Sequence, residues 1–428
     1  MNFIDKTSDF LHREWGKLLL FCAMCLIYFF SYFQRIAVPG TCFDELQGDF
    51  SASAAAVTAL GSIFLYVYGF AQFFVGMAAD RFGGQRTMLA GAAILSGASL
   101  VFPFSHSLPM LYITRAILAA GASMIFISLA KEIDTLFNPR HFAVWLGIAL
   151  LLGYSGGIAG TYPFERAIVH FGWRNSMLWA GILCLFALIA ASVIFRRFPS
   201  GAAQGKTSKI SYLGRVLRNP LSYPPTVAGA INFAIYLLFQ CTLAKKMLTD
   251  CCHVSSSRAA AVTFAMMIAC TVSASLSGFV SRLIGNRRKP VILAGVLLTL
   301  SMTIMLACAM RGSPDYRIIS AGLVMLGIAA SPSPLVLTAT KEINPAPAAA
   351  TSMGMANFAA YVAVAVIINI AGVVMDCFNE QAVVTTRGIL YPVAAYRLIL
   401  AGCAFLSMIS LIAARFIRET RGQAALPN

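Results

Sequence analysis

The residue best placed to do chemistry in this sequence is Arg35, in the stretch SYFQRIAVPG. No residue from Leu18 to Tyr32 is charged, and a charge inside a bilayer is costly and usually functional. Tyr28, Tyr32, Arg35 and Pro39 stand at positions i, i+4, i+7 and i+11, which share one face of a helix. A guanidinium beside aromatic hydroxyls is typical of a water-filled cavity, so we expect Arg35 and Tyr32 to contact a small anionic ligand.

A second interpretation of Arg35 starts from its depth in the membrane. At 1.5 Å per residue, the arginine lies about 25 Å along a helix that begins at Leu18. A long basic side chain at that depth can extend along the helix to the membrane surface. The sequence alone leaves both interpretations open.

Neutral polar side chains recur at helical spacing in other apolar runs. Each of them either forms hydrogen bonds between helices, worth about 1 kcal/mol or less, or faces a cavity. As a set they favour a polar lining that binds a solute. The set comprises Tyr68 and Gln72, Asn232, Tyr236 and Gln240, and Asn357 and Tyr361.

Acidic residues are scarce in the apolar runs. The 16 Asp and Glu residues lie in predicted loops or near the ends of runs, whereas a proton-driven exporter of cations needs a carboxylate deep in the membrane. Glu132 and Glu342 come nearest to a run, each in a repeated Lys-Glu-Ile. We interpret both as salt-bridge partners in a cytoplasmic gate, and only in second place as proton sites.

The composition excludes a soluble protein. Of the 428 residues, 59% are hydrophobic and 11% are charged, and the mean hydropathy is +0.78. A soluble domain carries roughly a quarter charged residues. The 11 cysteines are scattered, and no nucleotide-binding or catalytic motif occurs. We therefore expect no disulfide framework, no cofactor, no metal and no enzyme activity.

Apolar runs of about the length of a spanning helix predict an all-α membrane protein with twelve transmembrane helices. Pro332 and Pro334 predict a kink in one run, and the glycines of GYSGGIAG (153–160) predict a close-packed face in another. The runs are 18–40, 54–77, 87–104, 109–130, 142–163, 173–195, 223–244, 259–281, 290–310, 317–340, 348–375 and 391–414.

The net charge of +16 reflects membrane topology and not nucleic-acid binding. Lys and Arg concentrate in loops that share one side of the membrane, above all in residues 196–218 and 282–289. Cytoplasmic loops carry such an excess. We expect a monomeric multi-pass protein of the cytoplasmic (inner) membrane, surrounded by lipid, with both termini in the cytoplasm.

The two halves of the chain repeat one another. Three short echoes keep almost one spacing, and they are AAAVT at 54–58 and 259–263, DRFGGQR at 80–86 with SRLIGNR at 281–287, and KEI at 131–133 and 341–343. Repeats of six helices are an architecture of transporters, whose solute site lies between the repeats. The long polar break predicts a first bundle at 1–196, a cytoplasmic linker at 197–222 and a second bundle at 223–428.

The stretch GMAADRFGGQR (76–86) resembles the signature G-x-x-x-D-R-x-G-x-x-R of the major facilitator superfamily. The resemblance implies two pseudo-symmetric six-helix bundles around a cavity lined by helices 1, 2, 7 and 11. It also implies a cytoplasmic gate, in which Gly76 permits close helix packing, Gly83 makes a tight turn and Asp80 locks one state. The residues assigned to gating are Gly76, Asp80, Arg81, Gly83, Arg86, Glu132, Arg282, Arg287 and Glu342.

Residues 68–83, YGFAQFFVGMAADRFG, are similar to helix two of bacterial organic-anion transporters in that superfamily. Arg35 resembles the arginine of an Asp-Arg pair in their first helix, which implies that it holds a substrate carboxylate. Gln34 stands where those transporters have the aspartate, and glutamine cannot titrate, so the coupling ion, H⁺ or Na⁺, stays open. RAILAAG (115–121) is similar to an arginine motif of helix four, which implies either a cavity role or packing for Arg115.

These patterns predict a secondary transporter that moves a small organic anion, such as a sugar acid or carboxylate, by alternating access. Uptake by symport follows only from the resemblance. The alternatives are an exporter of neutral or drug-like solutes, a facilitator or anion exchanger without proton coupling, and, more remotely, a non-transporting membrane sensor. The expected site comprises Tyr32, Gln34, Arg35, Tyr68, Gln72, Arg115, Asn232, Tyr236, Gln240, Asn357 and Tyr361.

Overall fold

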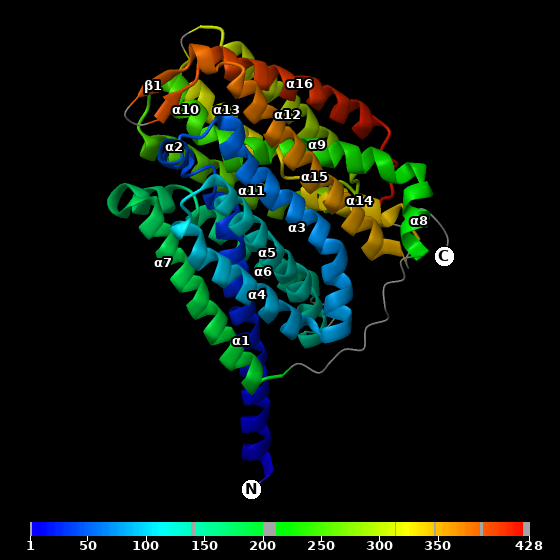
Figure 1. Cartoon of the computed structure of the whole chain (residues 1–428). Coiled ribbons are helices and arrows are strands. Elements are labelled where there is room, and N and C mark those ends of the chain that lie inside the picture. The colour runs from blue at the N-terminus through cyan, green and yellow to red at the C-terminus, as the bar shows by residue number, and fades with distance from the viewer. Residues whose placement is uncertain are drawn as a thin grey trace.

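Long helices make up nearly all of the molecule (Figure 1). The structure, a computed structural model, describes residues 2–137, 142–199, 211–312, 314–345, 348–385 and 388–422. The helices of the first half are α1 (Asn2–Ala37), α2 (Phe43–Asp49), α3 (Ala54–Phe82), α4 (Gly84–Val101), the 3₁₀ turn η1 (Phe102–Phe104), α5 (Leu108–Leu136), α6 (Phe142–Ala159) and α7 (Tyr162–Arg197).

The second half repeats this plan and adds a small hairpin of two antiparallel strands, with Val383 opposite Leu390. Its elements are α8 (Ser211–Arg218), η3 (Pro220–Ser222), α9 (Tyr223–Leu238), the π-helix η4 (Phe239–Leu243), α10 (Ala244–Cys252), α11 (Ser256–Leu283), α12 (Lys289–Ala309), α13 (Tyr316–Ala329), α14 (Ser333–Glu342), α15 (Ala349–Asp376), η6 (Asn379–Gln381), β1 (Val383–Thr385), β2 (Gly388–Leu390) and α16 (Val393–Arg415).

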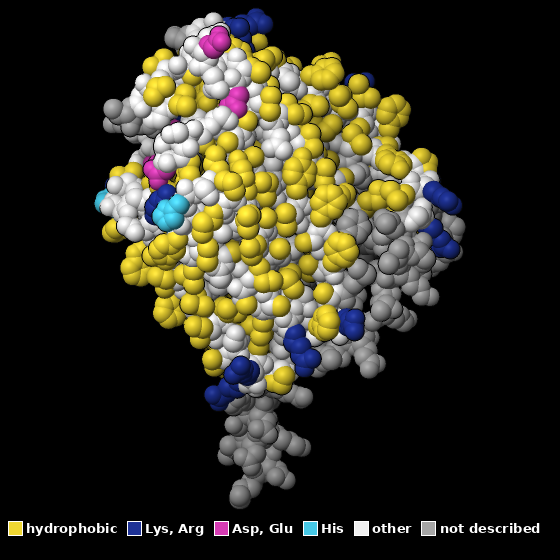
Figure 2. Space-filling view, in the orientation of Figure 1, with side chains coloured by type: hydrophobic (Ala, Val, Ile, Leu, Met, Phe, Trp, Pro, Cys, Tyr) yellow, Lys and Arg dark blue, Asp and Glu magenta, His cyan; other side chains and the backbone are white. Residues whose placement is uncertain are grey.

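Apolar side chains cover the middle of the molecule, and most visible charged side chains lie at the upper left and along the lower and right edges (Figure 2). Eleven stretches of the described residues are long and apolar enough to cross a membrane. The longest, Trp145–Arg197, spans both α6 and α7, and α7 bends at Gly172, where φ is +74°. Because this stretch covers two of the predicted runs, the eleven stretches account for all twelve. The all-α membrane class is therefore confirmed.

The spanning helices form two six-helix bundles. In the first, α1 packs against α5, α6 and α7, and α4 packs against α5 and α7. In the second, α12 packs against α13 and α16, while α9 packs against α15 and α16. Contacts of α3 with α15 and of α6 and α7 with α11 join the bundles. The proposed linker limits at 197 and 222 stay a prediction, although α7 ends at Arg197 and α9 begins at Tyr223.

Two helices of the second bundle are interrupted. The break between α13 and α14 falls at Pro332, as the two prolines of this run predict. The other interruption is η4, where a π-helical turn joins α9 to α10. The predicted run 223–244 is too short, because the helix continues through Lys245 and Lys246 to Cys252.

The glycines of α6 allow a close approach to α1, as predicted. A Cβ atom on Gly156 would lie 2.0 Å from the carbonyl oxygen of Phe29, and one on Gly153 would lie 2.1 Å from the ring of Tyr28. Phe29 presents backbone, which cannot move away as a flexible side chain can. The spacing between α1 and α6 therefore depends on Gly156.

Gly156→Ala is expected to lower the thermal unfolding midpoint of the detergent-purified protein, because overpacking costs about 1–3 kcal/mol. Gly147→Ala is the matched control, since Gly147 lies on the same helix and a Cβ there would meet no described residue within 4 Å. Equal midpoints for the two variants would show that α1 and α6 can separate without cost.

Candidate functional site

Arg35 lies between the two bundles and is enclosed by aromatic rings. It comes from the last turn of α1, Phe64 and Tyr68 come from α3, and Tyr361 comes from α15 in the second bundle. The guanidinium carbon is 4.2 Å from the ring centre of Tyr68, 4.8 Å from that of Tyr32 and 5.2 Å from that of Tyr361. We call Tyr32, Arg35, Phe64, Tyr68 and Tyr361 the arginine cage.

The hydrogen bonds of Arg35 leave much of its donor capacity unused. Nη1 donates to the hydroxyl of Tyr361 at 2.9 Å, and Nε has no hydrogen-bond partner among the described residues. The side chain is 4% exposed, and no carboxylate in the described part of the chain forms an ion pair with it. Arg35 therefore does not extend to the membrane surface, and the cage holds a cation without a counter-charge.

More tyrosines continue the cage along α1 and α6. The ring centres of Tyr32 and Tyr154 are 4.7 Å apart, and those of Tyr28 and Tyr32 are 5.9 Å apart. Tyr28 and Tyr32 are both buried. The one cation thus faces several aromatic rings whose hydroxyls can donate or accept hydrogen bonds.

Arg115 has a different role from Arg35, although both are arginines buried in the same bundle. Its guanidinium donates to backbone oxygens of Gln34 at 2.7 Å, Val38 at 2.5 Å, Leu60 at 3.3 Å and Arg35 at 3.4 Å. Three of these carbonyls lie at the end of α1, where helical partners are lacking, and the fourth lies within α3. Arg115 thus fixes the backbone that carries Arg35, which agrees with the packing interpretation of this residue.

Gln34 lies beside Arg35 on α1 with its side chain fully buried. Neither its amide nitrogen nor its amide oxygen has a hydrogen-bond partner among the described residues. An unpaired buried amide costs free energy, so this side chain is a second polar group near the cage with unused capacity.

Three predicted polar residues of the second bundle, Asn232, Tyr236 and Gln240, form hydrogen bonds within that bundle. Asn232 donates to the carbonyl of Ala329 at 3.0 Å and accepts from Thr299 at 2.5 Å. Gln240, in η4, donates to the carbonyl of Thr263 at 3.1 Å. The hydroxyl of Tyr236 likewise donates to the sulfur of Met267 at 3.3 Å. These three expected ligand-binding groups are therefore used between helices.

Gln72 and Asn357 contact each other across the two bundles. The amide of Asn357 donates to Gln72 Oε1 at 2.7 Å. Close by in the sequence of both helices, the rings of Phe70 and Phe358 meet at 5.1 Å. This pair joins α3 to α15, so in this structure the two amides bind each other and their contact with a solute stays a prediction.

The glycine-rich loop of the family signature has the turn that its sequence predicts. Gly83 has φ +86° between α3 and α4, and such a backbone conformation favours glycine. A Cβ on Gly76 would meet no described residue within 4 Å, so the close packing expected there is not seen. Arg81 and Arg86 are exposed, and the side chain of Asp80 lies outside the described residues.

Glu132 and Glu342 occupy corresponding places in the two bundles but have different partners. Glu132 accepts from the backbone nitrogen of Gln85 at 3.0 Å, at the N-terminus of α4. Glu342 forms an ion pair with Arg288 at 3.2 Å. The predicted partners Arg282 and Arg287 are exposed, so in this state the pairing arginine of the loop is the next residue along.

Charged residues that sequence reasoning missed close one end of the molecule. This end carries α2, β1, β2 and α10, and we call it the hairpin end. Lys245 forms an ion pair with Glu165 of α7 at 2.5 Å and also donates to the backbone oxygen of Thr41. The side chains of Lys245 and Glu165 are 3% and 0% exposed. A buried ion pair thus joins the two bundles.

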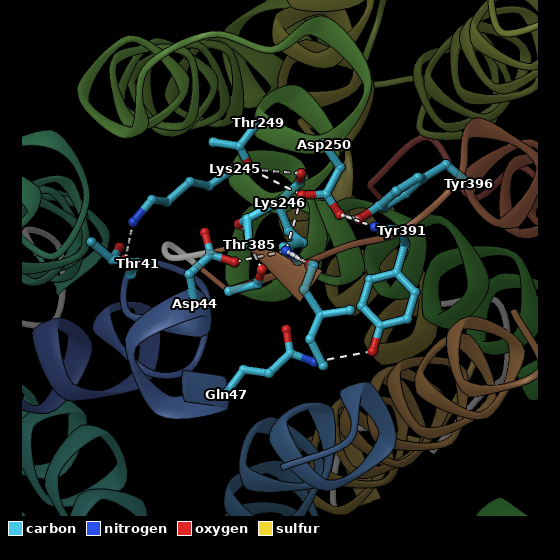
Figure 3. Close-up of polar contacts among 12 residues, drawn as sticks. Thr41, Asp44, Gln47, Lys245, Lys246, Thr249, Asp250, Thr385, Tyr391 and Tyr396 are labelled. Carbon is cyan, nitrogen blue, oxygen red and sulfur yellow. Dashed lines mark hydrogen bonds and ion pairs between the residues drawn. The ribbon is translucent and has the colours of Figure 1, made fainter. Parts of the chain in front are cut away.

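Lys246 forms a second contact of this kind (Figure 3). Its ammonium lies 2.7 Å from Asp44 of α2 and 2.9 Å from Asp250, one turn along α10. Asp250 also accepts from the Tyr396 hydroxyl at 2.6 Å and the Tyr391 nitrogen at 3.1 Å. Among the described residues, the ion pairs that join the bundles are those of Lys245 and Lys246, both at the hairpin end.

A signal for this end was present in the sequence. Lys245, Lys246 and Asp250 follow an apolar run directly, and lysine and aspartate at i and i+4 pair on one helical face. Because the predicted run ends at residue 244, Lys245 falls in a predicted loop and the shared helical face is not recognised. Glu165 could not be paired with Lys245 from the sequence, since 80 positions separate them.

Two six-helix bundles with a buried cation between them and ion pairs at one end form the architecture that the sequence predicts for a membrane transporter. The chain belongs to the Major Facilitator Superfamily, whose family model matches residues 20–367. Family membership thus places the chain among transporters and not among enzymes.

Solved structures share the fold. A bacterial homologue of the human lysosomal transporter Spinster, inward-facing and unoccupied, has a TM-score of 0.76 at 17% identity and covers 94% of this chain and 98% of that one.

Two curated relatives match part of the chain. The uncharacterized MFS-type transporter YcxA of Bacillus subtilis is 26% identical over 250 residues, 56% of this chain and 59% of that protein. The probable sulfoacetate transporter SauU of Cupriavidus necator is 22% identical over 203 residues, 45% of this chain and 44% of that protein. The match thus spans about half the length of these relatives.

Arg115→Lys is expected to lower the thermal unfolding midpoint, because a lysine cannot reproduce the fork that reaches four carbonyls, and bonds to a charged group are worth about 1.5–3 kcal/mol each. Arg311→Lys, at an exposed arginine, is the control and should leave the midpoint unchanged. An unaltered midpoint for Arg115→Lys would mean that these carbonyls need no fixed partner.

Proposed function

We propose that this chain is a secondary transporter that takes up a small organic anion across the cytoplasmic membrane, with Arg35 as the group that binds the anion. The site lies between the bundles, where transporters built from repeats bind their solutes. Both termini lie in the cytoplasm in this proposal, so the hairpin end faces outward. The excess of Lys and Arg in the loops at the opposite end supports this orientation.

The observation that carries the proposal is the uncompensated charge of Arg35. A buried cation is ordinarily paired, because taking an unpaired charge out of water costs several kcal/mol. Tyrosine rings attract the guanidinium but do not neutralise it. A carboxylate that enters the cage would supply the missing charge and would accept from the free Nε, so binding an anion is more favourable than leaving the site empty.

The composition of the cage favours a carboxylate with one negative charge and an apolar or aromatic body. The cage has one cation, since the donors of Arg115 are used by carbonyls. Its other groups are aromatic rings, and the neighbouring polar group with unused capacity is the single amide of Gln34. Asn232 and the amide nitrogen of Gln240, which could recognise sugar hydroxyls, are engaged between helices. Similarity to a protein named as a probable sulfoacetate transporter agrees with an organic anion.

Uptake into proteoliposomes tests the proposal with a panel of radiolabelled aromatic monocarboxylates, aliphatic monocarboxylates, sugar acids and a neutral sugar. We expect uptake of a monocarboxylate in preference to the sugar acids and the neutral sugar. Arg35→Ala should abolish it, because losing one partner of a buried charge pair costs about 2–5 kcal/mol, or at least about 30-fold in affinity. Arg258→Ala removes an exposed arginine at the hairpin end and should retain uptake.

The outcomes separate the candidate functions. Undiminished uptake by Arg35→Ala would remove the arginine from anion binding. Transport confined to neutral solutes, or from the inside outward, would indicate an exporter. Uptake that responds to a gradient of H⁺ or of Na⁺ identifies the coupling ion, and exchange without either gradient indicates a facilitator or anion exchanger.

A further inference from the structure

Two carboxylates lie near one lysine at the hairpin end: Glu165 forms an ion pair with Lys245, and Glu45 lies close enough to interact electrostatically with both. Glu165 lies in the first turn of α7 and Glu45 in the first turn of α2, and both belong to the first bundle. Lys245 belongs to α10 in the second bundle. We call these three residues the Lys245 cluster.

The Lys245 cluster is short of positive charge. Lys245 is bound to Glu165 Oε2, while Glu165 Oε1 and Glu45 Oε2 are buried and have no hydrogen-bond partner among the described residues. The neighbouring Lys246 cannot compensate for Glu45, because it is held by Asp44 and Asp250. With both glutamates ionised, a negative charge would be buried without a partner, at a cost of several kcal/mol.

Burial raises the pKa of Glu45 above its usual range. Lys245 and a hydrogen bond from the backbone of Glu45 itself oppose this rise, while the charges of Glu165 and Asp44 add to it. Other titratable groups that face α2 are Cys42, just before this helix, and Tyr391, which accepts a hydrogen bond from Gln47 at 3.0 Å (Figure 3). The neutral acid is thus the form of Glu45 that the closed hairpin end favours.

We propose that Glu45 is a proton-binding site, and that the hairpin end closes with one proton bound there. A neutral Glu45 leaves one carboxylate, Glu165, to pair with Lys245, so the closed cluster carries no net charge. When the bundles separate at this end, Lys245 leaves with the second bundle and Glu45 meets water, where it loses the proton.

The direction of the pH effect follows from where the proton binds more tightly. Because the pKa of Glu45 is raised in the closed state, protonation stabilises closure, and this stabilisation is lost as the pH rises through the raised pKa. A single proton changes the ratio of closed to open molecules by up to about tenfold per pH unit. The proposal rests on the proposed function only through the orientation that makes this end external.

Native cysteines allow the closure to be measured on the full chain without substrate. Cys42 is fully buried beside the cluster, whereas Cys377, just after α15, is exposed. Purified protein is treated with a bulky polar maleimide between pH 5.5 and 8.5, and alkylation of each cysteine is quantified by peptide mass spectrometry. The ratio of Cys42 to Cys377 modification reports opening, since Cys377 corrects for the effect of pH on thiol reactivity.

We expect the ratio to rise several-fold with pH in the unaltered protein. Glu45→Gln, which mimics the protonated acid, should hold the ratio low and independent of pH. Glu165→Gln should also abolish the pH dependence, because one carboxylate then matches one lysine. Asp49→Asn is the matched control on α2, since Asp49 is bound within the first bundle by Trp173 at 2.8 Å and should leave the pH profile unchanged.

Two results would overturn the proposal. One is a ratio that does not change with pH in the unaltered protein, and the other is an unchanged pH profile in a folded Glu45→Gln variant, with folding checked by its gel-filtration profile. Arg35→Ala separates this site from the anion site. It should keep the pH-dependent ratio even if uptake experiments remove Arg35 from substrate binding.

Discussion

The burial of a guanidinium that no carboxylate neutralises is the constraint on which the centre of this molecule depends. Arg35 is held by aromatic rings, which attract the cation without cancelling its charge. Arg115 makes this placement possible, because it binds the carbonyls at the end of α1 and fixes the backbone beneath Arg35. The two buried arginines therefore have different roles. Backbone oxygens use the donors of Arg115, whereas the charge of Arg35 stays available.

The hairpin end has a different role, because its buried ion pairs hold the two bundles together. Apolar packing alone would offer little discrimination between a closed interface and lipid, whereas buried ion pairs are sensitive to geometry and protonation. The attraction in a buried pair is largely offset by the loss of hydration. The contacts of Lys245 and Lys246 can consequently specify one arrangement without making it permanent, as alternation between two conformations requires.

The sequence predicts the parts of this structure that arise from local pattern. Apolar run length gives the spanning helices, paired prolines give the break before α14, and glycine spacing gives the contact of α6 with α1. It also assigns Tyr32, Arg35, Tyr68 and Tyr361 to one site, and these side chains do lie together, while their role in binding a solute stays a prediction. The partners of Asn232 and Glu165 could not be predicted, since they are set by how helices distant in sequence face each other. The predicted end of the run at residue 244 was wrong, because two consecutive lysines are typical of a loop and α10 continues to Cys252.

The π-helix at Phe239–Leu243 decides which way the two lysines point. Each residue of an α-helix advances about 100° around the axis, and a π-helical turn accommodates one residue more than an α-helical turn. Removing a single residue there would leave the hydropathy profile of the span nearly unaltered, yet it would swing both ammonium groups about a quarter of a revolution away from the opposite bundle. The direction in which side chains leave this helix does not show in its apolar content. Transporters that are otherwise similar can therefore differ in it.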